Sequence, residues 1–261
     1  IFDGAFPYRG MLRSIQGRPN ISKLWLRRGT FRKGASIPVD SIQHFDSIIR
    51  PMDSISEELE QIEHNLEVIT SDPIVLLDEE ELLMRNDVRT NLQLPLNATV
   101  VYVQLGAGEI NDINSEIRMT VENLISRENV FVVIGESMIG NRLNINLPNV
   151  KVIRDYPNSI YFKGFDAVIS AGGYNSYHEA RNFRLPTLFF PNQNTGMDDQ
   201  IARCKISEEE GWGLNLIDRN EKSIKKSIDD LIAKISQKRI VTEKSHGAQN
   251  LAELLNSRIG D

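Results

Sequence analysis

The chain has 261 residues and a mean hydropathy of -0.30, with 40% hydrophobic and 25% charged residues. This composition is typical of a globular protein and excludes a disordered or fibrous chain. No apolar run approaches the roughly 18 residues of a transmembrane helix. The single cysteine, Cys204, excludes an internal disulfide and a CxxC zinc site, and it is typical of a protein from a reducing compartment.

Charge is unevenly distributed along the chain. Residues 1–50 contain nine Lys or Arg and three Asp, which gives +6, so the other 211 residues carry -12 of the total of -6. An acidic body argues against general nucleic-acid binding. The basic segment either faces an anionic ligand or a membrane surface, or is simply a solvated face.

The first 95 residues contain short and irregular elements. The chain begins at Ile1, runs directly into a Gly/Pro turn and shows no signal peptide. We interpret this as a start within a domain, so that part of the working protein precedes it. We expect strand cores at residues 23–26 and 47–50 and a polar connector over 54–72. A short strand over 73–77 and a helix over 78–91 are expected to follow.

From Ala98 onward, short apolar runs alternate with helical patterns. The predicted strands are residues 100–105, 130–134, 150–153, 167–169, 187–190 and 214–216. Apolar residues at helical spacing predict helices over 113–125 and 224–235. This alternation predicts an α/β fold, a parallel Rossmann-like sheet with helices on both faces. A ligand site is expected beyond the carboxyl ends of the strands.

A glycine loop, Gly106-Ala107-Gly108, follows the first of these strands. Two glycines allow backbone N–H groups to approach a phosphate or a sugar closely. A dinucleotide-binding fingerprint needs a third glycine, and Asn111 stands in its place. A plain tight turn is the alternative.

A second segment, residues 169–179, places Gly172 and Gly173 before a predicted helix that opens with Asn175 and Ser176. Such a helix start attracts anions because its first N–H groups have no acceptor within the helix and because the positive end of the helix dipole lies there. Glu179 lies one turn further along the same edge, where a carboxylate can accept hydrogen bonds from a ribose diol. The alternative is that Asn175 only caps the helix and that Glu179 is a solvated acid.

A third segment, residues 185–200, leads from a strand through a polar loop into a helix. The loop gathers amides and carboxylates, including Asn194, Asp199 and Gln200, which suit the adjacent hydroxyls of a pyranose. Asp198 alone can be explained as a helix cap.

Together these segments resemble the nucleotide-sugar half of GT-B glycosyltransferases. The nearest families are glycosyltransferase family 28, typified by the peptidoglycan N-acetylglucosaminyltransferase, and the UDP-glycosyltransferases. The resemblance covers roughly residues 97–257. It rests on a glycine-rich turn with Asn or Ser, a Glu, a Pro seven residues later and an Asp-Gln pair, which this chain carries as Gly173, Asn175, Ser176, Glu179, Pro186, Pro191, Asp199 and Gln200.

The resemblance implies the domain organisation and the roles of the site residues. Residues 1–95 would be a remnant of the N-terminal acceptor-binding domain with the interdomain connector, and 96–261 the C-terminal nucleotide-sugar-binding domain. The implied contacts are the diphosphate at Gly172, Gly173, Asn175 and Ser176, the ribose at Glu179, the donor sugar at Asn194, Asp199 and Gln200, the base at Arg154 and Asp155, and a glycine loop at Gly106, Ala107 and Gly108. Arg9 would line a cleft, or would simply lie exposed in a turn.

The resemblance also implies an activity. The protein would be a hexosyltransferase that moves a hexose or N-acetylhexosamine from a nucleotide-diphosphate sugar, UDP by resemblance, to the hydroxyl of a sugar, lipid-linked or small-molecule acceptor. Inversion at the anomeric carbon, no metal and no cofactor are expected. The catalytic base would lie in the preceding part of the protein, so we name none. A cytoplasmic location is expected, with peripheral contact at the inner membrane face as an extension of it.

Two departures and three alternatives accompany this interpretation. Ala171 stands where many UDP-glycosyltransferases have a phosphate-binding His, and Arg184 where a Gly is common. A UDP-sugar epimerase or hydrolase of the same fold would share the diphosphate site. A non-catalytic donor-binding subunit would need a partner domain. An NAD enzyme is a more distant alternative, because the third glycine is missing.

Overall fold

The computed structural model describes residues 1–4, 7–28, 30, 32, 39–55, 66–106, 113–136, 142–196, 198–237 and 244–259. By their contacts, the residues form two compact units. The first contains Ile1–Val75, Thr195–Asp199 and Ser245–Asp261, and the second contains Leu76–Asn194 and Gln200–Lys244. Within the described part of the chain, no helix is both long and apolar enough to cross a bilayer.

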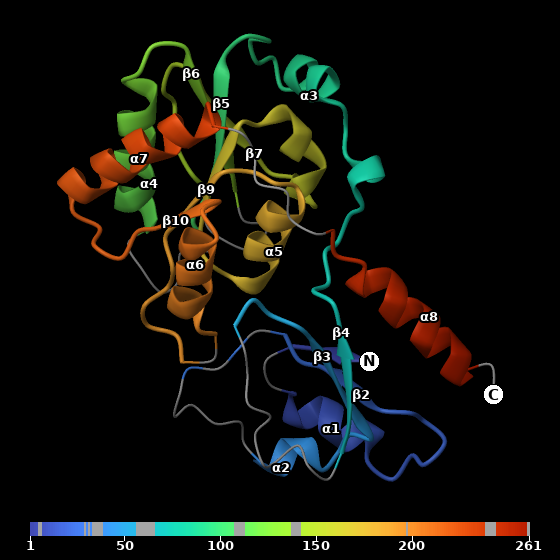
Figure 1. The fold of residues 1–261 in the computed structure, drawn as a ribbon. Helices are drawn as coiled ribbons and strands as arrows, with labels where there is room; N and C mark the ends of the chain where they lie inside the picture. The colour runs from blue at the N-terminus through green and yellow to red at the C-terminus, as the bar shows by residue number, and fades with distance from the viewer. Residues whose placement is uncertain are drawn as a thin grey trace. The chain divides into compact units, whose positions relative to one another are not determined.

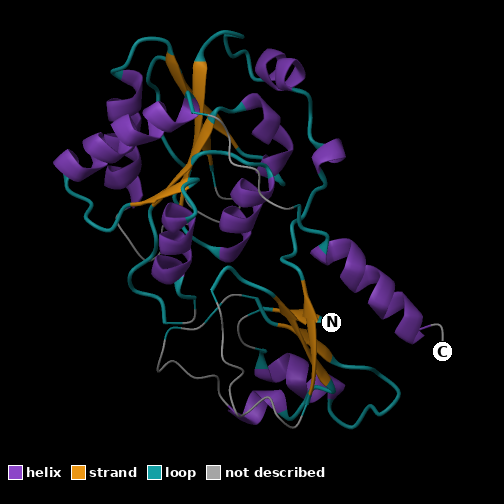
Figure 2. Ribbon diagram, viewed as in Figure 1, coloured by secondary structure: helices purple, strands orange, loops and turns teal. Residues whose placement is uncertain are grey.

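The first unit is built on a four-stranded parallel sheet with the order β1-β2-β3-β4 (Figures 1 and 2). Its strands are β1 (Phe2–Asp3), β2 (Leu24–Leu26), β3 (Ser47–Pro51) and β4 (Glu67–Ser71), and its helices are α1 (Arg9–Ile15), α2 (Val39–Ile42) and α8 (Gly247–Ile259). Trp25 is fully buried against Phe45 and Ile48, and its indole N–H donates to the carbonyl of Gly4. Leu251 of α8 packs on Ile49 and Ile69.

The second unit is built on a six-stranded parallel sheet with the order β10-β9-β8-β5-β6-β7. Its strands are β5 (Thr99–Gln104), β6 (Val130–Gly135), β7 (Val150–Ile153), β8 (Ala167–Ser170), β9 (Thr187–Phe189) and β10 (Gly213–Asn215). The α-helices are α3 (Arg85–Asn91), α4 (Ile113–Ile125), α5 (Tyr174–Asn182), α6 (Gln200–Glu209) and α7 (Glu221–Ile235), and the 3-10 helices are η2 (Glu79–Glu81) and η3 (Asn158–Gly164).

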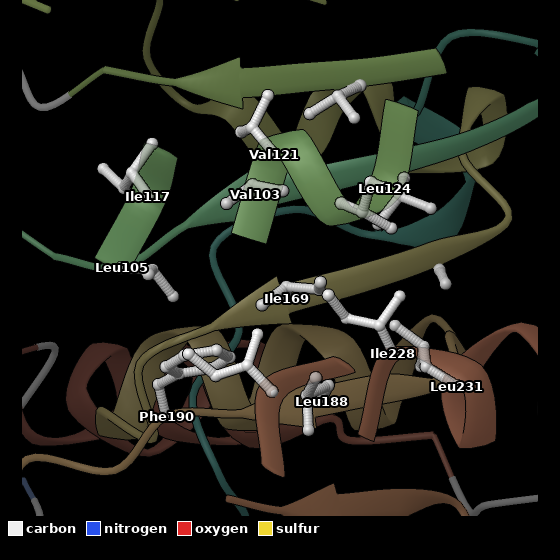
Figure 3. Close-up of a cluster of buried hydrophobic side chains, with 14 of the residues drawn as sticks. Val103, Leu105, Ile117, Val121, Leu124, Ile169, Leu188, Phe190, Ile228 and Leu231 are labelled. Carbon is white, nitrogen blue, oxygen red and sulfur yellow. The ribbon is translucent and has the colours of Figure 1, made fainter. Parts of the chain in front are cut away.

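Helices cover both faces of this sheet. On one face, α4 and α7 insert side chains such as Val121, Leu124 and Ile228 against Val103 and Ile169 of the strands (Figure 3). On the other face, side chains from α3 and η3 pack against further strand residues, in a cluster of Val88, Phe162, Val100, Tyr102 and Val168. The predicted α/β class, with parallel strands and helices on both faces, is therefore confirmed.

Three of the expectations for the first 95 residues are wrong. Residues 73–77 form no strand, and a strand instead occupies Glu67–Ser71, inside the expected polar connector. This strand pairs with β3 and buries only Ile69, so its sequence lacks a long apolar run. The helix expected over 78–91 is divided, because Met84 adopts an extended conformation between η2 and α3.

Residues just before β5 belong to the second unit by their packing. Leu82, Val88 and Leu94 share a core with the sheet. Arg89, fully buried, donates to the carbonyls of Pro95, Leu96 and Ala98 and to the carboxylate of Asp166, which fixes the turn into β5. The assignment of residues 1–95 to an acceptor-binding domain and connector is not tested by these contacts and stays a prediction.

Candidate functional site

The candidate site lies in the second unit, where β8 ends and α5 begins. Between them, Gly172 is buried and Gly173 is the N-cap of α5, with φ -63° and ψ 151°. A Cβ atom on Gly172 would overlap Sγ of Cys204, so the missing side chain allows α6 to approach the turn. The sequence therefore places a glycine where two helices and a strand end meet.

The cap residue determines what the start of α5 can bind. The first N–H groups of a helix have no acceptor within the helix, and Ser, Thr, Asp or Asn at the N-cap usually supplies one. Gly173 has no side chain to do so. Asn175 is the second residue of α5 and is exposed, so the alternative in which Asn175 only caps the helix is wrong. This start is suited to an anionic ligand.

Glu179 lies in the middle of α5 and is not a solvated acid. Its Oε1 accepts a hydrogen bond from the hydroxyl of Ser159 at 3.0 Å, and Ser159 itself is 2% exposed. Burial raises the pKa of Glu179 to about 7, and the Ser159 hydrogen bond opposes part of that rise. The alternative of a solvated carboxylate is therefore wrong, and a ligand hydroxyl would meet a carboxyl that titrates near neutrality.

The predicted base loop follows β7 and leads into η3. Asp155 accepts hydrogen bonds from the Tyr161 hydroxyl at 2.6 Å and from the Tyr156 N–H at 2.8 Å, and these bonds lower the pKa of Asp155. Nη1 of Arg154 lies 3.8 Å from Oε2 of the buried Glu136. Because η3 also carries Ser159, it connects the base loop to Glu179.

The loop after β9 brings one predicted sugar-binding residue to the glycine turn. Oε1 of Gln200 accepts the N–H of Asn192 at 2.9 Å, and a Cβ atom on Gly173 would lie 3.9 Å from Nε2 of Gln200. Asn194 is exposed, and its N–H donates to Oδ1 of Asn192 at 2.8 Å.

Two predicted residues belong to the first unit by their contacts. The N–H of Asp199 donates to the carbonyl of Thr30 at 2.6 Å, and Oδ1 of Asp199 lies 3.8 Å from Nε of Arg32. Arg9 is exposed at the start of α1. The roles predicted for Asp199 in sugar binding and for Arg9 in a cleft stay predictions.

The predicted glycine loop is described only at its first residue. Gly106 follows β5 with φ +97°, a conformation that favours glycine over other residues. Ala107 and Gly108 lie outside the described residues. Among the residues that the structure describes, no three His, Cys, Asp or Glu side chains gather as a metal site, and catalysis without a metal stays a prediction.

Sequence reasoning missed two side chains that support the site, Ser159 and Arg203. Ser159 precedes Glu179 by twenty residues, and no spacing rule connects them. Arg203 is fully buried on α6, and its Nη1 donates to the carbonyl of Gly172 at 2.8 Å. His178 is also buried, and its ring packs 4.4 Å from that of Tyr174.

A family model supports the resemblance inferred from the sequence. Residues 100–255 match the family described as "Glycosyltransferase family 28 C-terminal domain". A UDP-N-acetylglucosamine--N-acetylmuramyl-(pentapeptide) pyrophosphoryl-undecaprenol N-acetylglucosamine transferase of Clostridioides difficile (strain 630) is 27% identical over 163 residues, which is 59% of this chain and 39% of that protein. An uncharacterized glycosyltransferase of Methanosarcina acetivorans is 34% identical over 92 residues, 34% of this chain and 23% of that protein. The matches to these curated relatives therefore span less than half of their length.

Solved structures agree with the fold. A spinosyn rhamnosyltransferase complexed with thymidine diphosphate aligns with a TM-score of 0.56 and 16% identity, over 82% of this chain and 60% of that one. A spinosyn forosaminyltransferase aligns with a TM-score of 0.55 and 13% identity, over 91% of this chain and 70% of that one. At these identities the likeness concerns the fold.

Proposed function

The chain belongs to glycosyltransferase family 28 through its C-terminal domain, and on this premise we propose that it binds a nucleoside-diphosphate sugar and transfers the sugar to an acceptor hydroxyl. The transferred group is a hexose or an N-acetylhexosamine. One observation carries the proposal: a glycine N-cap and a partly buried, titratable carboxyl lie on the same short helix, α5. The first suits a diphosphate and the second a ribose.

The helix start would stabilise the leaving group. As the bond from the anomeric carbon to the diphosphate oxygen breaks, negative charge accumulates on the diphosphate. N–H groups and the positive end of a helix dipole stabilise such charge without rearrangement. In the proposal the diphosphate lies against Gly172, Gly173, Asn175 and Ser176, which perform the task that a divalent cation performs in other transferases.

Glu179 would hold the ribose. Its Oε1 is oriented by Ser159, and the ribose hydroxyls donate to the carboxylate in its ionised form. Arg154 and Asp155 would lie against the base, and Asn194, Asp199 and Gln200 would bind the donor sugar. We name no catalytic base within the described residues.

The donor nucleotide and the acceptor are further parts of the proposal. UDP is supported by the name of the Clostridioides difficile relative, which specifies UDP-N-acetylglucosamine as its own donor. That relative acts on a lipid-linked sugar, and a lipid-linked or other sugar acceptor is proposed here, with inversion at the anomeric carbon. The net charge of +6 on residues 1–50 would favour peripheral contact with an anionic membrane surface.

Calorimetric titration with UDP, TDP, GDP and NAD tests donor binding. We expect UDP to bind most tightly and Glu179→Ala to weaken UDP binding by about tenfold or more, because hydrogen bonds to a charged group are lost. Glu208→Ala, at an exposed position of α6, is the matched control and should bind as the wild type does. If no nucleoside diphosphate binds, the proposal is wrong.

Turnover distinguishes the activities that share such a site. UDP release from a UDP-sugar should depend on added acceptor. Release at the same rate without any acceptor would instead indicate a UDP-sugar hydrolase.

A further inference from the structure

Arg203 is a buried cation directly beneath the glycine turn. Its side chain has 0% exposure, although it lies on a helix that is otherwise largely polar. Burying a guanidinium is costly unless its N–H groups find acceptors. One acceptor is the carbonyl of Gly172, at 2.8 Å from Nη1, and the guanidinium carbon also lies 5.7 Å from the centre of the Tyr174 ring.

The contact with Gly172 determines how one peptide unit is oriented. The bond between Gly172 and Gly173 is trans, so the N–H of Gly173 points away from the carbonyl of Gly172. Because that carbonyl points toward the buried guanidinium, the N–H points in the opposite direction, away from α6.

The hydrogen bond also changes the strength of that N–H as a donor. An interaction between a charged donor and a carbonyl is shorter and stronger than a neutral one. It polarises the peptide unit, and polarised hydrogen bonds strengthen one another in a low dielectric. The Gly173 N–H is therefore a better donor to an anion than an ordinary peptide N–H would be.

Other residues of α6 hold the same turn in place. Sγ of Cys204 occupies the space that a Cβ atom on Gly172 would take, and Cβ of Gln200 would lie 3.3 Å from that atom. Tyr174, the first residue of α5, contacts both Arg203 and the ring of His178. The first turn of α6 thus forms the floor of the turn that opens α5.

We propose that Arg203 is a positioning residue for the donor diphosphate: it fixes the Gly172–Gly173 peptide with its N–H directed at a phosphate oxygen and strengthens that N–H as a donor. This inference rests on the proposed function, since it needs the diphosphate at the start of α5. It adds a distinct consequence, because the effect of Arg203 falls on the phosphates of the ligand and leaves the nucleoside unaffected.

Titration of the full chain with UDP, UMP and uridine tests this consequence. We expect Arg203→Met to weaken UDP binding by about tenfold, the usual effect of one charge-assisted hydrogen bond, and to leave uridine affinity unchanged. Arg203→Gln keeps an N–H donor without the charge, and its affinity for UDP should lie between those of the wild type and Arg203→Met. Lys205→Met, at an exposed position of α6, is the control and should bind all three ligands as the wild type does.

The amide resonance of Gly173 gives a readout without ligand. In the ligand-free chain, its proton shift should move upfield in Arg203→Gln, because the peptide is less polarised, and should stay unchanged in Lys205→Met. If Arg203→Met fails to fold, the Gln variant decides the matter through its affinities and this shift.

The outcomes distinguish the role of Arg203 from the proposed function. A larger loss of affinity for UDP than for uridine, with the shift of Gly173, supports the inference. Equal losses for UDP and uridine would mean that Arg203 is merely structural, and no loss for either would mean that the turn does not depend on it; both overturn the inference while leaving the proposed function intact. A wild type that binds no nucleoside diphosphate overturns the proposed function and this inference with it.

Discussion

Two charged groups of opposite sign lie at helix α5, and their supports differ: Arg203 lies beneath its start and Glu179 lies further along it. On the side of the glycine turn, α6 supplies the guanidinium of Arg203, bonded to the carbonyl of Gly172. On the side of Glu179, η3 supplies the neutral hydroxyl of Ser159. A guanidinium keeps its proton at any accessible pH, whereas burial raises the pKa of Glu179 to about 7.

Because of this difference, the glycine turn and Glu179 should respond differently to pH. The support of the glycine turn should not vary between pH 5 and pH 8. The carboxyl of Glu179 should change its charge within that range. In the proposed function, the contribution of the protein to phosphate recognition is therefore constant, whereas its contribution to ribose recognition depends on pH.

The largest expected effect is on stability, in Glu179→Gln. The pKa of Glu179 lies above its ordinary value of 4.5, so the folded state retains a proton that the unfolded state releases. The stability that Glu179 contributes is fully present below about pH 4.5 and is lost as pH rises through about 7. We expect urea unfolding at pH 8 to show the Gln variant more stable than the wild type by up to about 3 kcal/mol, with little difference at pH 5.

The control for this prediction lies on the other side of α5. The difference in unfolding free energy between Arg203→Gln and the wild type should be constant from pH 5 to pH 8. If the unfolding free energies of the wild type and Glu179→Gln vary in parallel with pH, the raised pKa of Glu179 is contradicted.

The next effect compares neighbouring glycines. Gly172→Ala should lower the free energy of unfolding by about 1–3 kcal/mol, because the new methyl group overlaps Cys204 and the core cannot yield freely. Gly173→Ala should be nearly neutral, since its φ of -63° suits alanine and its Cβ atom would lie 3.9 Å from Gln200. Thermal unfolding of the two variants checks this, and equal losses would show that the floor of the turn is not close-packed.

A third effect concerns ligand binding as a function of pH. The ionised fraction of a carboxyl with a pKa of about 7 rises from about a tenth at pH 6 to about nine tenths at pH 8. UDP affinity of the wild type relative to Glu179→Gln should therefore increase about tenfold over this range. The ratio of the two affinities cancels the titration of the phosphate itself. A ratio that does not change with pH would show that Glu179 does not contact the ligand.

The smallest effect is expected for Ser159→Ala. Its hydroxyl lowers the pKa of Glu179, so the variant should shift the midpoint of the pH dependence upward and weaken UDP binding at pH 7 by roughly threefold. Affinity should recover at higher pH, which a general loss of structure would not produce. Ser126→Ala, an exposed serine whose hydroxyl bonds the carbonyl of Asn123, is the control.

The central strands of the second unit, β5, β6, β8 and β9, could be predicted because they are buried on both faces. Val100 and Val101, for example, point into opposite cores, and such strands are continuous apolar runs in the sequence. The short strand at Glu67–Ser71 was missed because it buries one side chain, Ile69, between polar neighbours. The run of apolar residues after Pro73 looked more like a strand and is not one.

The position of the candidate site could be predicted from the sequence, but the residues that support its side chains could not. A strand that ends in glycines before a helix predicts a ligand site, which stays a prediction here, and the spacing places Glu179 one turn further on. Its burial depends on Ser159, which lies in a separate element. Nothing in the sequence distinguishes Arg203 from the other polar residues of α6, because only tertiary packing places its guanidinium under Gly172.

The chain leaves the first unit after Val75, returns to it for Thr195–Asp199, and enters it for the last time at Ser245. Each unit bonds its own ends of the chain: in the first unit the Ser245 hydroxyl bonds the carbonyl of Pro73, and in the second Nζ of Lys244 lies 2.8 Å from Oε2 of Glu79. A protease that cuts after Val75 therefore produces two pieces, residues 1–75 and 76–261, which stay together through contacts inside the first unit, such as those of Leu251 in α8 with Ile49 and Ile69. Limited digestion of this protein should produce a nicked molecule that separates only under denaturing conditions.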